Sequence, residues 1–218
     1  MSSHVHIQKL EILNSFFKSH TRIQYKKGET VLRPEDQTDD VFLVEWGFVK
    51  SYIMTKYGEE NLLVVRGTGS VFPIIRVFTG EGRNVTYEAM EPTSLWRVRR
   101  IDYVEFLDKN PDVLPIILDM AIDSYRLHSE RVITLTYRTA RERVVSFLLT
   151  LAKRFGVPQK DGTTIINAPF RQSDIASSIN ATRETTSREI NGLRKKNLID
   201  VIDHKIIIKD KKAMRELL

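Results

Sequence analysis

The residue types and their spacing change along the chain, and this change limits the folds that it can adopt. Between about residues 22 and 98, short runs rich in valine, isoleucine, phenylalanine and tyrosine alternate with turn residues. Seven of the ten glycines lie between residues 28 and 82. Closely spaced strands separated by turn residues predict an antiparallel sandwich or barrel. The strand-like runs are VFLV (41–44), FVKSYIM (48–54), NLLVV (61–65), NVTYEAM (84–90) and SLWRV (94–98).

Helical spacing surrounds this region, at residues 7–17 and again at 101–111. The longest helical pattern then runs from Asp112 to about Tyr137, and its Pro115 falls in the first turn, where proline is tolerated. One face of this pattern carries a seam whose members are spaced alternately three and four residues apart. The seam consists of Leu118, Ala121, Tyr125, His128, Val132 and Leu135.

A polar-flanked stripe of about three heptads predicts a partner helix and therefore a homodimer; the alternative is a helix that lies against its own domain. A break near residues 138–141 precedes another helical stretch at 141–156, which Gly156 and Pro158 stop. We therefore expect three parts: a sensor domain with flanking helices (1–111), a long dimerisation helix (112–138) and a C-terminal domain (139–218).

Composition excludes several classes of protein. There is no cysteine, which rules out disulfides and an iron–sulfur cluster. No apolar run approaches the roughly 20 residues that span a bilayer, and the first residues do not resemble a secretory signal, so we expect a cytoplasmic protein without membrane contact. The histidines, at 4, 6, 20, 128 and 204, avoid the strand region. We therefore predict no metal site, no catalytic residue and no enzyme.

The excess positive charge lies near the C-terminus. Residues 139–218 contain 16 lysines and arginines against 9 acidic residues, whereas residues 1–138 contain 18 against 19. Cations concentrated in one segment suit a polyanionic partner such as double-stranded DNA. The alternative is a solvated surface with a chance asymmetry, and charge alone does not decide between them.

Residues 170–210 carry the most specific pattern, that of two short helices followed by two strands. Ser173 is expected to cap the first helix, and Asn180 tolerates the left-handed backbone that a tight turn needs. Thr182 is expected to cap the second helix. A small alanine at 176 lets the two helices approach closely. The inward-facing residues are predicted to be Ile175, Ala176 and Ile179 in the first helix, and Thr186, Ile190 and Leu193 in the second.

The opposite face of the second helix suits base recognition. It gathers Arg183, Glu184, Ser187 and Arg188. Arginine can fork onto guanine, and glutamate can accept a hydrogen bond from cytosine. The alternative is an ordinary solvated face. Residues 199–209 then alternate around the polar centre 203–205 (Asp-His-Lys), which predicts a two-stranded wing.

Residues 182–188 (TRETTSR) resemble the recognition helix of the cAMP receptor protein/FNR (Crp/Fnr) superfamily of bacterial regulators. Residues 28–29 (GE) and 40–50 (DVFLVEWGFVK) are similar to the first barrel motif of that superfamily, and 110–112 (NPD) to the entry of its long helix. The resemblance covers essentially the whole chain. It implies an α+β fold: an N-terminal antiparallel β-barrel of the cyclic-nucleotide-binding jelly-roll type, a long dimerisation helix and a C-terminal winged helix-turn-helix.

The resemblance also implies the function of a sequence-specific transcription regulator. If the regulator is an activator, RNA polymerase is a further expected partner. Two-fold symmetry would require an inverted repeat, with G·C-rich, TGA-like half-sites about one helical turn apart. Bases would be contacted by Arg183, Glu184 and Arg188, with Ser187 aiding. The predicted DNA-binding set also includes Thr182 and Ser173.

The sequence indicates the identity of the effector less specifically than it indicates the DNA-binding residues. Members that bind cyclic AMP carry a Gly-Glu pair and an Arg-Ser/Thr-Ala, whereas this chain reads FPII at 72–75 and RNV at 83–85. Loss of the charged acceptor costs about 1.5–3 kcal/mol, which disfavours cyclic AMP and leaves an unknown small molecule. The residues expected to meet an effector are Arg76, Arg83, Tyr125, His128 and Ser129.

Each of these candidates has a plainer alternative. His128 is the histidine best placed for a haem ligand, yet a lone histidine in a helical seam is more often a packed structural residue. Arg76 and Arg83 could recruit an acidic effector, or they could be surface charges on a barrel that binds nothing. In that case the protein would bind DNA constitutively, and its barrel would serve only dimerisation.

Overall fold

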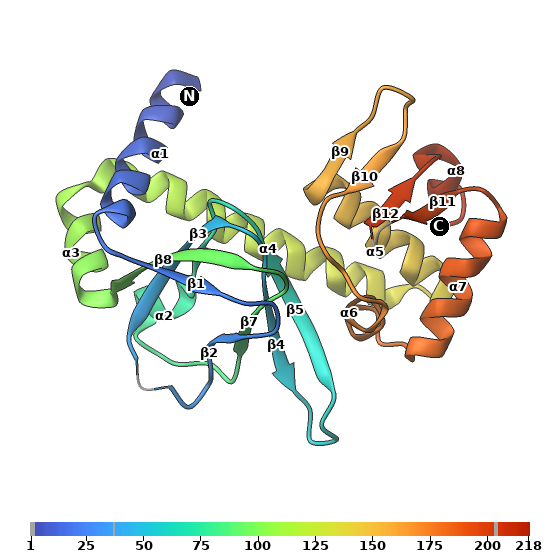
Figure 1. The fold of residues 1–218 in the computed structure, drawn as a ribbon, viewed down its shortest axis with the longest axis horizontal. Helices are drawn as coiled ribbons and strands as arrows, with labels where there is room; N and C mark the ends of the chain where they lie inside the picture. The colour runs from blue at the N-terminus through green and yellow to red at the C-terminus, as the bar shows by residue number, and fades with distance from the viewer. Residues whose placement is uncertain (1–2, 37, 203–204) are drawn as a thin grey trace. The chain divides into compact units, whose positions relative to one another are not determined.

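A computed structural model describes residues 3–36, 38–202 and 205–218, with side chains from residue 8 onward. Contacts divide the chain into two compact units, shown in Figure 1: residues 1–58 with 63–126, and residues 59–62 with 127–218. We refer to them as the N-terminal unit and the C-terminal unit. The three-part division expected from the sequence stays a prediction, because these units are defined by contacts and not by function.

The N-terminal unit is built on two four-stranded sheets, in the orders β1-β8-β3-β6 and β2-β7-β4-β5. The pairs β1–β8, β3–β8, β3–β6, β2–β7 and β4–β7 are antiparallel, which confirms the predicted all-antiparallel barrel. The strands are β1 (Thr21–Tyr25), β2 (Thr30–Leu32), β3 (Asp40–Trp46), β4 (Val49–Met54), β5 (Glu60–Arg66), β6 (Val71–Phe72), β7 (Thr86–Ala89) and β8 (Thr93–Arg99).

Strand β3 shows how the barrel divides its core into two. Val41 and Leu43 belong to a cluster beneath the helices, whereas Phe42 and Val44 belong to a second cluster with Phe72. Successive side chains of a strand point to opposite faces, so a strand covered on both sides reads as a continuous apolar run. The VFLV stretch at 41–44 is such a run, and the second cluster forms the interior of the barrel.

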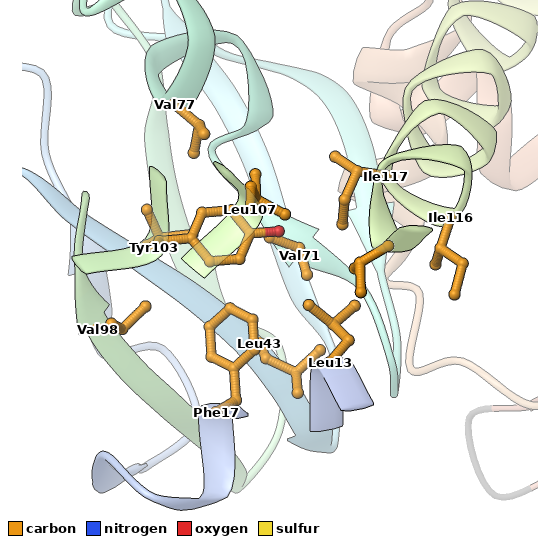
Figure 2. Packing of buried hydrophobic residues seen from close by; sticks show 12 residues of the cluster. Leu13, Phe17, Leu43, Val71, Val77, Val98, Tyr103, Leu107, Ile116 and Ile117 are labelled. Carbon is orange, nitrogen blue, oxygen red and sulfur yellow. The ribbon is translucent and has the colours of Figure 1, made fainter. Parts of the chain in front are cut away.

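Figure 2 shows the first cluster, in which helices cover the outer face of one sheet. Leu13 and Phe17 come from α1 (Ser3–Lys18), Tyr103 from α3 (Arg100–Lys109), and Ile117 from α4 (Leu114–Thr136). Tyr103 is fully buried, and among the described residues its hydroxyl has no hydrogen-bond partner. Burial raises the pKa of this phenol. The aromatic ring, rather than the hydroxyl, is therefore what the cluster uses.

Two helical details differ from the prediction. A short helix α2 (Ile74–Thr79) was not expected, and it begins within the FPII segment at 72–75. The long helix is confirmed, but its first expected turn is the 3₁₀ helix η1 (Pro111–Val113), after which α4 begins. Pro115 is the second residue of α4, as its sequence position required.

The C-terminal unit packs helices against a small antiparallel sheet of order β11-β12-β10-β9. Strands β9 and β10 and helix α8 were not predicted, because elements of three to five residues are too short to show a period. The elements are α5 (Ala140–Phe155), β9 (Gly156–Pro158), β10 (Thr164–Ile166), α6 (Gln172–Ser178), α7 (Arg183–Lys195), β11 (Ile199–Ile202), β12 (Lys205–Ile208) and α8 (Lys211–Arg215).

Candidate DNA-binding site and sensor barrel

The start of α6 corrects one prediction. Ser173 is not the N-cap, because the helix begins at Gln172 and Arg171 occupies the cap position. The backbone N–H of Arg171 donates to Oδ2 of Asp174 at 2.7 Å. A carboxylate three residues into a helix accepts a stronger, charge-assisted hydrogen bond than a serine hydroxyl provides. Ser173 is exposed on the first turn, and its contact with DNA stays a prediction.

The turn between α6 and α7 has the predicted geometry. Asn180 adopts the left-handed conformation with φ of 51°, and the backbone N–H of Ala181 donates to the carbonyl of Ala176 at 3.1 Å. The side chains of Ile175 and Ile179 are no more than 1% exposed. The short side chain of Ala176 lets the turn close directly over the helix, so α6 and α7 form a compact helix-turn-helix.

Helix α7 separates its two faces cleanly. Thr182 caps the helix by accepting a hydrogen bond from the backbone N–H of Thr185 at 3.1 Å. Both predictions for the faces are confirmed. The predicted inward residues Thr186, Ile190 and Leu193 are buried; Arg183, Glu184 and Arg188 are exposed, with Ser187 half-buried beside them.

Glu189 is a residue that the sequence analysis missed. It is buried on α7, and its carboxylate accepts from Nε of Arg141 at 2.9 Å and from Nε of Arg188 at 3.4 Å. The first contact ties α7 to the start of α5. The second orients Arg188, a predicted base-contacting residue. A glutamate one position from the apolar stripe was the available signal, because a buried carboxylate needs a cation.

Arg143 was also missed, and it joins three chain segments. Its guanidinium donates to the carbonyl oxygen of Ile179 at 3.0 Å and to those of Tyr137 and Arg138, each at 3.1 Å. The first is the C-cap of α6, and the other two lie between α4 and α5. Carbonyls at helix ends lack intrahelical partners, so one arginine here holds the junction closed.

The predicted wing is confirmed in its strands. β11 and β12 pair antiparallel, with Ile199 opposite Ile208 and Ile202 opposite Lys205. Of its predicted polar centre, Lys205 starts β12, while residues 203–204 lie outside the described residues. β10 pairs with the other side of β12, which gives the wing a broader base than two strands alone would provide.

Comparison with known proteins agrees with this arrangement of parts. Residues 142–217 match the family model of the Crp-like helix-turn-helix domain, and residues 22–110 match the cyclic nucleotide-binding domain. The chain is 32% identical over 192 residues to the global nitrogen regulator of Synechococcus elongatus, covering 85% of this chain and 84% of that protein. The chain belongs to the Crp/Fnr family.

Other Crp/Fnr relatives support the same assignment. The transcriptional activator protein FnrL of Cereibacter sphaeroides is 26% identical, covering 80% of this chain and 71% of that protein. The solved structure of FixK2 from Bradyrhizobium japonicum shares the fold with a TM-score of 0.77 at 24% identity, covering 90% of this chain and 96% of that one. FnrL is named a transcriptional activator, and FixK2 adds the likeness of the fold.

In this Crp/Fnr chain the two predicted effector arginines have different surroundings. Arg76 lies on α2 and forms an ion pair with Asp39, whose Oδ1 is 3.2 Å from Nε; Arg100 also approaches Asp39, at 3.7 Å. Arg76 therefore already has a counter-charge. Arg83 is exposed in the loop between α2 and β7. Their part in an effector site stays a prediction.

The other effector candidates, Tyr125, His128 and Ser129, are all exposed on α4. The seam that contains two of them is exposed as well: Leu118 by 60%, Tyr125 by 75%, Val132 by 64% and Leu135 by 41%. Apolar side chains rarely stay open to water in a row along one helix, so this face needs a cover.

No helix among the described residues is long and apolar enough to cross a membrane. In the same part of the chain, no group of three histidine, aspartate or glutamate side chains is arranged to hold a metal ion.

Proposed function

We propose that this Crp/Fnr regulator binds DNA as a homodimer, with one α7 helix in each of two successive major grooves of an inverted repeat. In each half-site Arg183 and Arg188 fork onto guanines and Glu184 accepts from a cytosine, with Ser187 aiding these base contacts and Thr182 and Ser173 completing the DNA-binding set. Half-sites about one helical turn apart would match the two-fold symmetry.

The division of α7 into a buried and an exposed face carries this proposal. Arg183, Glu184 and Arg188 are all exposed, while the residues behind them anchor the helix. Glu184 is the informative member, because phosphates repel a carboxylate unless a base donor meets it. A helix that bound only the DNA backbone would be expected to carry cations alone on this face.

The exposed seam of α4 supports the homodimer. Packing Leu118, Val132 and Leu135 against the same residues of a second copy would remove them from water. Two recognition helices are also what an inverted repeat requires. As an activator the dimer would in addition contact RNA polymerase, and a regulator of this kind would work in the cytoplasm.

We place control of DNA binding in the barrel, through an effector other than cyclic AMP. The helix α2 begins at Ile74, inside the segment where cyclic-AMP-binding members carry the Gly-Glu pair, and Asn84 follows Arg83 where they carry serine or threonine. The competing proposal is a constitutive regulator whose barrel serves only dimerisation. The two differ in whether a small molecule changes the affinity for DNA.

Selection of binding sites from a random duplex pool tests both proposals. The purified full chain would be used without additions and again with a metabolite extract, beside Arg183→Ala, Glu184→Ala and the control Lys160→Ala. Lys160 is exposed in the loop between β9 and β10, away from α7 in the fold of this unit. The control removes one positive charge, as Arg183→Ala does.

The regulator proposal predicts an inverted repeat for the wild-type chain. Specificity at the matching base should fall by about 1–3 kcal/mol in the Arg183 and Glu184 variants but not in the Lys160 variant. Enrichment that requires the extract supports effector control, and equal enrichment without it supports the constitutive proposal. Equal specificity of all variants, or no enriched sequence under any condition, would reject base recognition by α7.

A further inference from the structure

The interior of the barrel contains a cation that the sequence analysis did not single out. Arg66 is the last residue of β5, and its guanidinium lies 5.9 Å from the ring centroid of Phe72 and 5.5 Å from that of Tyr87. Both rings belong to the interior cluster, and they stack on each other at 5.0 Å. One nitrogen of Arg66 donates to Oγ of Ser51 at 2.9 Å.

This cation has no counter-charge among the described residues. Its contacts are a hydroxyl and two aromatic faces, and burial lowers its pKa with only the phenol of Tyr87 opposing that effect. Arginine nevertheless remains protonated in proteins. Lys50, a buried cation of the same unit, is paired with Glu88 at 3.4 Å.

A buried charge without an opposite charge is costly, and contacts with aromatic faces offset only part of that cost. Arginines are rarely buried unless they are paired. The residue as a whole is half-buried, so the charge is not sealed off completely from solvent. Arg66 is therefore a cation whose recorded contacts are two aromatic rings and a hydroxyl, an arrangement suited to bind an anion.

We propose that the barrel binds a small carboxylate, whose two oxygens fork onto the guanidinium of Arg66 and whose apolar part contacts Phe72 and Tyr87. Ser51 holds the guanidinium in position from the other side. The planar fork of arginine matches a carboxylate in two parallel hydrogen bonds. This inference rests on the proposed effector control and adds a chemical class and an anchoring residue to it.

The charge balance favours a carboxylate over a phosphate. One guanidinium and one hydroxyl supply a single positive charge, which a carboxylate neutralises, whereas a doubly charged phosphate monoester would leave one negative charge buried. The site also differs from the position implied by the family resemblance. Arg83, which occupies the phosphate-binding position of that resemblance, is exposed on a loop.

Thermal unfolding of the full chain with simple probes tests the proposal. Acetate, succinate, benzoate and inorganic phosphate would be added at matched ionic strength, with benzamide as the neutral counterpart of benzoate. At least one carboxylate should raise the Tm in proportion to the logarithm of its concentration, and benzamide and phosphate should not. A Tm that rises with phosphate but with no carboxylate would overturn the assignment, as would no rise with any anion.

Substitutions at single residues test whether the rise in Tm comes from binding at Arg66. In Arg66→Met the rise should disappear, with Kd at least about tenfold weaker, while in Arg99→Met, which removes an exposed arginine of the same unit, it should persist. Without probe, Arg66→Met should unfold at the wild-type temperature or above, because an unpaired buried charge has been removed. Ser51→Ala, a milder change, should weaken carboxylate binding and serves if Arg66→Met does not fold. An unchanged response in these variants would reject the site.

Failure of this inference can be told from failure of the proposed function, because the thermal measurement contains no DNA. A chain that selects an operator but ignores carboxylates rejects the Arg66 site alone. A chain that binds a carboxylate through Arg66 but selects no operator keeps the site and rejects base recognition by α7.

Discussion

Helices α7 and α4 expose opposite kinds of surface. α7 buries its apolar stripe within its own unit and leaves arginines and a glutamate open to water, whereas α4 leaves apolar side chains such as Tyr125 and Val132 open. The first arrangement is complete without a second protein copy and suits a polyanion. The second is incomplete in a single chain and suits another apolar helix. The two helices therefore require different partners, and changes to them should have different consequences.

The largest expected effect is on assembly. Val132→Glu places a charge in the middle of the α4 seam, where two copies would bring like charges together, so the proposed dimer should become a monomer of 25.3 kDa. Light scattering or sedimentation would measure the mass. Arg126→Glu introduces the same residue outside the seam and should leave the dimer intact. A dimer that survives Val132→Glu would show that the seam is covered in another way.

The next effect is on folding of the C-terminal unit. Leu193→Ala, at a fully buried position of α7, should cost about 2–5 kcal/mol in the free energy of unfolding, because it leaves a cavity. Leu118→Ala, at a seam position exposed by 60%, should leave the stability of an isolated monomer nearly unchanged. Chemical denaturation over a range of protein concentrations separates the two. If both variants lost the same free energy of unfolding, and both losses depended on protein concentration, the proposed difference between the two helices would be wrong.

A smaller effect is expected at the junction next to α7. Arg143→Met removes the donor to three carbonyl oxygens and should cost about 1.5–3 kcal/mol of stability in the same unit. The methionine retains most of the apolar stem. Arg138→Met, at an exposed position nearby, is the matched control. A loss no larger than that of the control would mean that water replaces the guanidinium at these carbonyls.

At Glu189 the expected loss is in DNA recognition more than in stability. Glu189→Gln retains the shape but removes the charge that orients Arg188 and anchors Arg141. Specificity at the base read by Arg188 should weaken by about 1 kcal/mol, less than in Arg188→Ala itself. Competition binding with operators altered at single bases would measure it. Unchanged specificity would assign Glu189 to anchoring α7 alone.

The smallest effect concerns pH. Hydrogen bonds from the backbone N–H and the hydroxyl of Thr139 lower the pKa of Glu142, which completes the cap of α5. A folded-state pKa below the unfolded value adds stability that is fully present above the unfolded pKa of about 4.5 and is lost as the pH falls through the folded value. Glu142→Gln should therefore lose less stability between about pH 6 and about pH 3 than the wild type. An identical pH dependence in urea unfolding would contradict this.

Much of the fold could be predicted because its signals are local. The continuous apolar run of β3 is contained within that strand, and the three-and-four spacing of α4 and the two faces of α7 repeat with the period of a helix. The cap at Thr182 and the left-handed Asn180 are equally local. Even the error at Ser173 is a local one, since Asp174 competes for the same first turn.

The candidate contacts that the prediction missed depend on residues far apart in the chain. Glu189 is defined by Arg141, which lies 48 positions earlier, and Arg143 acts on a carbonyl 36 positions later. Nothing in the neighbourhood of either residue in the sequence indicates these partners. The spacing of a helix or strand places a side chain on a face, but it does not say what covers that face.

The sequence by itself determined the order of the longer elements and the residues exposed on α7, because both follow from periods of two and of about 3.6 residues. The tertiary structure alone decided that Arg66 is buried against Phe72 and Tyr87, and that Arg76 is paired with Asp39. In the sequence, these are two arginines that each follow a pair of apolar residues. Their charges differ in environment because burial and counter-charge are set by strands and loops brought together on folding.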